Sequence, residues 1–182
     1  VTGISAGAAV ISYIVTSSCG SDTVSYPITV GSSASAGTIS GALSICIGST
    51  SSLSSTVGGG AWSSSVPSVA TVGASTGIVN GVAAGTATIS YTVTTSCGTA
   101  FATAVATING LPTITATVTP ATCGSVSSGV ATGGVSYTWA PSSGITCPAC
   151  ATTNIDPAAT TTYTVTGTDA AGCTGTATVT VN

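Results

Sequence analysis

Residues 62–97 read WSSSVPSVATVGASTGIVNGVAAGTATISYTVTTSC, and this stretch determines the fold that we predict. Near its end, apolar residues alternate with Thr and Ser, so that Ala87, Ile89, Tyr91 and Val93 share one side. This period of two is typical of a β-strand with one buried and one solvent-facing side. Glycines recur through the stretch and predict tight turns that join several short strands.

The same text occurs at the start of the chain. Residues 1–20 (VTGISAGAAVISYIVTSSCG) align without a gap with residues 79–98 (VNGVAAGTATISYTVTTSCG), at an offset of 78 residues. An alignment of this length indicates a repeat. Because strand-like sequence precedes Val79 from about Cys46 onward, Val1 corresponds to the middle of a repeat unit.

The composition argues against several classes of partner. Of the 182 residues none is Lys, Arg or His, and the only charged side chains are three Asp. A chain without cations cannot neutralise phosphates, so we expect no nucleic-acid partner. No apolar run approaches the ~20 residues of a membrane span, so we expect no membrane insertion.

The strand pattern predicts an all-β chain of two complete small domains and one partial domain. Residues 1–33 are the C-terminal half of a unit followed by a Gly/Ser-rich linker, 34–110 are the first complete domain, and 111–182 are the second. Domains of this size have a small core and modest stability.

Two motifs resemble known families. Residues 62–72 (WSSSVPSVATV) and 77–89 (GIVNGVAAGTATI) resemble group 2 bacterial immunoglobulin-like domains. Residues 137–150 (YTWAPSSGITCPAC) and 160–181 (TTTYTVTGTDAAGCTGTATVTV) are similar to immunoglobulin-like or polycystic-kidney-disease-type repeats of secreted Bacteroidetes surface proteins. The resemblance implies tandem immunoglobulin-like β-sandwiches, with a partial sandwich at the N-terminus. Such modules serve as stalks, adhesin spacers and filament parts.

The seven cysteines predict disulfides and hence an oxidising, extracellular or cell-surface location. Zinc is the alternative, but His is absent and Cys-x-x-Cys occurs once. In a sandwich, cysteines before and after the core Trp can be bridged. The pairs that flank Trp62 and Trp139 are separated by 51 and 50 residues. We therefore predict the bonds Cys46–Cys97, Cys123–Cys173 and a local Cys147–Cys150.

Other candidate sites have structural interpretations that we favour. Trp62 and Trp139 could stack on sugars, but each is expected to be the core residue of its sandwich. Neither a metal nor another cofactor is expected, because Asp156 and Asp169 lie in separate turns and too few carboxylates exist for calcium. No His or Lys can activate a Ser or Thr, so we expect no catalytic residue and no enzyme. The sequence Asp-Thr-Val around Thr23 resembles a Bacteroidetes O-glycosylation pattern and makes Thr23 a possible glycan site.

The half unit at the N-terminus suggests how the chain assembles with other copies. Residues 1–30 carry apolar positions that half a sandwich cannot bury, and unpaired strand backbone is costly. Either residues upstream complete the unit, or strands of a neighbouring subunit do so by strand addition. We favour the second route, with Cys19 unpaired in its own chain. The function we expect is a structural subunit of an extracellular filament that binds other copies of itself; the alternative is a stalk or carbohydrate-binding module of an adhesin.

Overall fold

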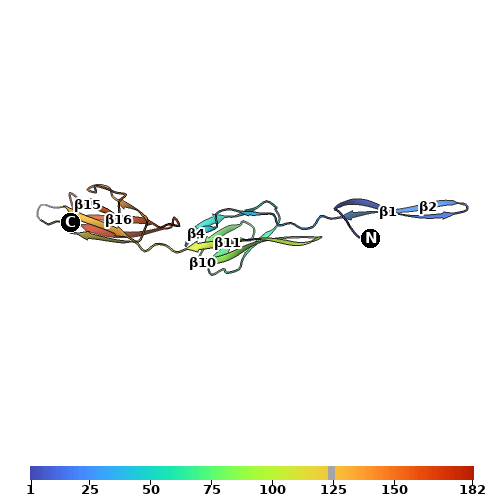
Figure 1. Ribbon diagram of the computed structural model, residues 1–182, viewed down its shortest axis with the longest axis horizontal. Coiled ribbons are helices and arrows are strands. Elements are labelled where there is room, and N and C mark those ends of the chain that lie inside the picture. The colour runs from blue at the N-terminus through green and yellow to red at the C-terminus, as the bar shows by residue number, and fades with distance from the viewer. Residues whose placement is uncertain (123–125) are drawn as a thin grey trace.

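The computed structural model describes residues 1–122 and 126–182, in which every regular element is a β-strand. The prediction of an all-β fold is therefore confirmed. The chain forms three bodies that follow one another along its length, as Figure 1 shows: an N-terminal hairpin, a middle sandwich and a C-terminal sandwich. We call the last two unit 2 (residues 34–110) and unit 3 (residues 111–182), because each of the two hydrophobic cores lies within one of these ranges.

The N-terminal hairpin consists of two long strands and nothing else. These are β1 (Gly7–Ser17) and β2 (Gly20–Val30), which form an antiparallel two-stranded sheet. The ladder continues from Gly7 opposite Val30 to Ser17 opposite Gly20. Alternating apolar residues explain why these segments form strands, but alternation alone does not supply a layer to pack against.

Unit 2 is a β-sandwich of short strands and one long hairpin. Its larger sheet has the order β4 (Ser44–Cys46), β11 (Gly98–Asn109), β10 (Gly85–Thr95), β7 (Ala61–Ser64). The facing sheet has the order β5 (Thr50–Ser52), β9 (Ile78–Gly81), β8 (Ala70–Val72), and β3 (Ile39–Ser40) pairs with β6 (Ser54–Ser55). Trp62, Val79, Ile89, Tyr91 and Ile108 are among the residues buried between the layers.

Unit 3 is a second sandwich, of two three-stranded sheets. One has the order β12 (Thr115–Thr119), β13 (Ser127–Thr132), β15 (Thr152–Ile155). The other has the order β14 (Ser136–Ala140), β16 (Thr161–Thr168), β17 (Thr174–Val181). Its core is built around Trp139, Tyr163 and Val165, none of which is more than 1% exposed.

Candidate functional site: an unpaired hairpin and the junctions between units

The N-terminal hairpin is exposed on both faces. Within the described residues its sheet contains β1 and β2 alone, so both outer edges are unpaired there. Tyr13 and Tyr26 are 71% and 72% exposed, and Ile14 is 60% exposed. An isolated two-stranded hairpin is at best marginally stable in water. The hairpin therefore carries a large apolar surface that no other described residue covers.

The hairpin of β10 and β11 is its buried counterpart. The two ladders have the same register at the 78-residue offset, since Gly85 lies opposite Ile108 and Thr95 opposite Gly98. The four residues that β10 turns to the core are at most 6% exposed: Ala87, Ile89, Tyr91 and Val93. The same four residue types recur on β1 at Ala9, Ile11, Tyr13 and Val15, where the last three are 42–71% exposed. The exposed hairpin thus has the core face of a sandwich.

Tyr91 shows what a partner strand supplies on one edge. Its hydroxyl oxygen accepts a hydrogen bond from the backbone N–H of Gly60 at 2.8 Å, and its ring lies 4.6 Å from that of Trp62. Trp62 lies on β7, which pairs antiparallel with residues 89–92, and Gly60 directly precedes this strand. The equivalent edge of the N-terminal hairpin is residues 11–14, which include Tyr13.

The other edge of the buried hairpin pairs with β4. This strand runs parallel to the end of β11, with Cys46 opposite Asn109. The side-chain amide of Asn109 also donates a hydrogen bond to the Oγ of Ser44 at 2.8 Å. Residues 29–31 occupy the equivalent edge of the N-terminal hairpin, and Gly31 aligns with Asn109.

A free cysteine lies at the tip of each of these two hairpins. The backbone N–H of Cys97 donates to the Oγ1 of Thr95 at 3.2 Å, and that of Cys19 donates to the Oγ of Ser17 at 3.3 Å. The residue after each cysteine is a glycine with positive φ, which glycine adopts without steric cost. Both cysteines are exposed and unbonded. The two turns therefore present a thiol in the same way.

Units 2 and 3 are joined covalently at their junction. Cys46, at the end of β4, forms a disulfide with Cys173, and the two Cα atoms are 5.6 Å apart. Cys173 lies just after the turn between β16 and β17. The carboxylate of Asp169 accepts hydrogen bonds from the backbone N–H groups of Ala171 at 2.9 Å and Cys173 at 2.8 Å. This turn, which the sequence predicts at Asp169, thereby holds Cys173 in place.

The structure corrects the predicted pairing of these cysteines. Cys46 bonds Cys173 instead of Cys97, and Cys173 cannot then bond Cys123, which lies outside the described residues. Cys46 and Cys97 lie at opposite ends of the long hairpin of unit 2, separated by an 11-residue strand. Such a strand is roughly 35 Å long, whereas a disulfide requires Cα atoms within about 7 Å.

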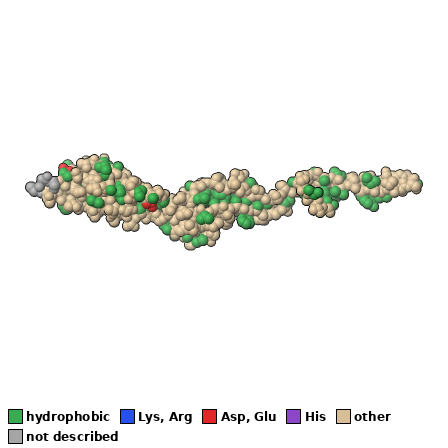
Figure 2. All heavy atoms as spheres, in the orientation of Figure 1, with side chains coloured by type: hydrophobic (Ala, Val, Ile, Leu, Met, Phe, Trp, Pro, Cys, Tyr) green, Lys and Arg blue, Asp and Glu red, His purple; other side chains and the backbone are tan. Residues whose placement is uncertain are grey.

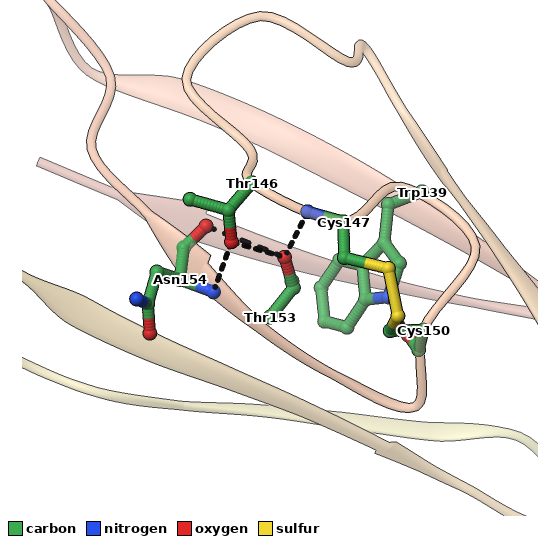
Figure 3. Close-up of a disulfide and its surroundings, with 6 residues drawn as sticks. All are labelled: Trp139, Thr146, Cys147, Cys150, Thr153 and Asn154. Carbon is green, nitrogen blue, oxygen red and sulfur yellow. Dashed lines mark hydrogen bonds between the residues drawn. A yellow bond between two sulfur atoms is a disulfide. The ribbon is translucent and has the colours of Figure 1, made fainter.

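A second disulfide, Cys147–Cys150, closes a loop over Trp139, as Figure 3 shows. The indole N–H of Trp139 donates to the carbonyl oxygen of Cys150 at 2.9 Å, and the backbone N–H of Cys147 donates to the Oγ1 of Thr153 at 3.0 Å. These bonds fasten the loop to the core. The pair serves as a local staple in this arrangement, and two disulfides fit an oxidising environment.

The remaining candidate residues are Trp62, Trp139 and Thr23. Trp62 is 7% exposed and Trp139 is 1% exposed, so neither indole face is available for stacking on a sugar. Thr23 is exposed on β2, and its backbone N–H donates to the carboxylate of Asp22 at 2.9 Å.

On the face that Figure 2 draws, acidic side chains are few, basic side chains are absent, and hydrophobic side chains are scattered among the others. In the part of the chain that the structure describes, no three acidic, His or Cys residues gather closely enough to hold a metal ion. No helix in the same part is long and apolar enough to cross a membrane.

Comparison with known proteins adds no family to these observations, because no family model and no curated protein matches the chain.

Proposed function

We propose that this chain is a structural subunit of an extracellular filament or surface polymer, in which strands of one copy complete the N-terminal hairpin of another. The observation that carries the proposal is the pair of hairpins. One core face, Ala-Ile-Tyr-Val on alternate positions, is buried in unit 2 and exposed on β1. Burying such a face contributes roughly 25 cal/mol per Å² of apolar surface, so a complementary strand layer would bind it strongly.

The edges of the hairpin support assembly by strand addition. Exposed edges are usually protected by Lys or other charges, and this chain has no Lys or Arg to place there. An unprotected edge can pair with a strand of another molecule through backbone hydrogen bonds. The partner that we propose is therefore another copy of the chain, with no nucleic acid involved.

The disulfides support the location. Both bonds require an oxidising compartment to persist, which is why we place the polymer outside the cell or on its surface. Glycans on exposed hydroxyls such as Thr23 would hydrate a surface with so few charges. We assign the polymer no catalytic role, since the chain has neither His nor Lys to activate a hydroxyl nucleophile.

A stalk of a surface adhesin is the second candidate. The end-to-end arrangement in Figure 1 and the covalent Cys46–Cys173 junction suit a stiff spacer. The two functions differ in what the exposed hairpin does: a filament uses it between copies, whereas a stalk does not.

Electron microscopy of purified chain, with two matched double variants, tests the proposal. Ile11→Thr/Tyr13→Thr removes apolar groups from the core face of the hairpin. Val10→Thr/Ile14→Thr removes them from the opposite face, where β10 itself has Thr88 and Thr92. We expect regular fibres from the wild type and the second variant, and monomers from the first. Monomers from all three at high concentration would contradict the filament and favour the stalk.

A further inference from the structure

The cysteines at the hairpin tips lie in equivalent places at two junctions. At the junction of units 2 and 3, the tip cysteine Cys173 reaches back to the preceding unit and bonds Cys46. At the junction before it, the tip cysteine Cys97 reaches back to the N-terminal hairpin. There a Cβ built on Gly31 would overlap the Sγ of Cys97.

Gly31, which Cys97 contacts, has an equivalent position in unit 2. Gly31 aligns with Asn109, and Asn109 lies directly opposite Cys46 in the ladder of β11 and β4. The thiol of Cys97 therefore lies beside the N-terminal hairpin at the place where, one unit later, the interunit disulfide is formed.

A glycine lies at the base of each of the two hairpins. Gly81 lies against β4: a Cβ there would come within 2.7 Å of the carbonyl oxygen of Cys46 and 3.1 Å of the Cγ2 of Ile108. Gly3 aligns with Gly81, and a Cβ there would come within 2.8 Å of the Cγ1 of Val30, the counterpart of Ile108. Both glycines thus lie close to the equivalent side chain of their hairpins, Val30 and Ile108.

We infer that the N-terminal hairpin accepts a half-unit built like residues 36–84 of this chain, and that a cysteine of this half-unit, opposite Gly31, forms a disulfide with Cys97. The cysteine ends a strand that runs parallel to residues 29–31, as β4 does beside β11. A second strand with a Gly-x-Trp sequence, like Gly60 to Trp62, pairs with residues 11–14 and covers Tyr13.

The inference deepens the proposed function and rests on it for the idea that a partner completes the hairpin. It adds the partner's chemistry, the register of its strand and a covalent bond. The bond forms between two thiols as an external disulfide, such as oxidised glutathione, is reduced to its two thiols, so that electrons and protons balance. Each completed junction is then linked as units 2 and 3 are.

The test uses the full chain and, as probe, a peptide of residues 36–84, whose single cysteine is Cys46. The two are mixed in a glutathione redox buffer, and the product is identified by intact mass and chymotryptic mapping. We expect a one-to-one adduct joined through Cys46 of the probe and Cys97 of the chain. The adduct should persist in the Cys19→Ser chain and disappear in the Cys97→Ser chain. A probe that joins Cys19 as readily as Cys97, or no adduct at all, would overturn the inference.

The two double variants of β1 test which face of the N-terminal hairpin the probe binds. The Ile11→Thr/Tyr13→Thr chain should lose the adduct by about tenfold or more, and the Val10→Thr/Ile14→Thr chain should keep it within about twofold. Equal yields from both variants would mean that the probe does not bind the core face of the hairpin, for example because it displaces strands of unit 2, and would refute the inference. Fibres without probe capture would leave the proposed function standing alone, whereas capture without fibres would leave only the acceptor site.

Discussion

The hairpins β1–β2 and β10–β11 have the same register, the same kind of tip and the same apolar residue types on one face. In β1–β2 this face is exposed, whereas in β10–β11 it is buried in the core of unit 2. Ile89 is 0% exposed, whereas Ile11, its counterpart, is 42% exposed. The comparison separates two steps of folding. Residue alternation and the turn set the hairpin locally, while burial depends on β4, β7 and the facing sheet, which only unit 2 supplies within the described chain.

The largest expected difference comes from truncating the same residue in both hairpins. Ile89→Ala should lower the free energy of unfolding of unit 2 by about 2–5 kcal/mol, because it leaves a cavity in a packed core. Ile11→Ala in the unassembled chain should change stability by no more than about 0.5 kcal/mol, since the side chain is exposed. Urea denaturation followed by circular dichroism, to which the strands of both hairpins contribute, measures both. Equal losses would show that the N-terminal hairpin is packed in its own chain.

The tip cysteines allow the next comparison. Cys46→Ser, which removes the bond to Cys173, should cost about 2–4 kcal/mol because the cross-link restricts the unfolded chain. Cys97→Ser should cost nothing measurable in the unassembled chain, where this thiol is free. Thermal unfolding of the oxidised proteins gives the two values, and repeating it after reduction provides the control. If Cys97→Ser were as costly as Cys46→Ser, Cys97 would have a bonded partner in its own chain.

A smaller effect distinguishes the turn of unit 3 from the turns at Cys19 and Cys97. Asp169→Ala removes the acceptor for two backbone N–H groups and should cost about 1–2 kcal/mol. Thr95→Ala removes a single hydroxyl acceptor, at an exposed turn, and should cost less. Refolding in a redox buffer should also form the Cys46–Cys173 bond more slowly in the Asp169 variant. Unchanged stability and unchanged bond formation would mean that the turn does not position Cys173.

The smallest expected effect concerns one hydroxyl group. Tyr91→Phe loses the hydrogen bond from the N–H of Gly60 and should cost about 1 kcal/mol. Tyr13→Phe should have no effect in the unassembled chain, but should weaken capture of the residue 36–84 probe by a few-fold. A stability loss from Tyr13→Phe in the unassembled chain would show that its hydroxyl already has a partner there.

The residue pattern was sufficient to predict part of this structure. Alternation around Ile89 and Tyr91 placed β10 and its core face, and it placed the same face on β1. The two tryptophans were expected in the cores, where they lie. Alternation could not reveal whether an inward face has a layer opposite it, because that layer is distant in sequence or belongs to another molecule.

The sequence did not predict the disulfide partner of Cys46 correctly. The nearly equal separations of 51 and 50 residues show that cysteines occur at similar places in the two units, not that these cysteines are bonded to each other. One signal pointed the other way: the Ser-Cys-Gly sequence at Cys19 and Cys97 marks a turn, and a cysteine at a hairpin tip lies far from the base of its own unit. Bonding to a neighbour then follows from which ends of the units meet, which no local pattern encodes.

The Cys46–Cys173 bond also determines how the molecule responds to pulling. Tension applied along the array enters unit 2 through its first strands, reaches Cys46, crosses the sulfur atoms to Cys173 and leaves through β17. The bond spans a sequence separation of 127 residues, which include most of both sandwiches. Fully extended, that segment would add roughly 400 Å of length. While the disulfide is intact, the segment between Cys46 and Cys173 cannot be extended by tension. After reduction it can unfold and extend, so the redox state of this one junction determines how far the chain stretches under load.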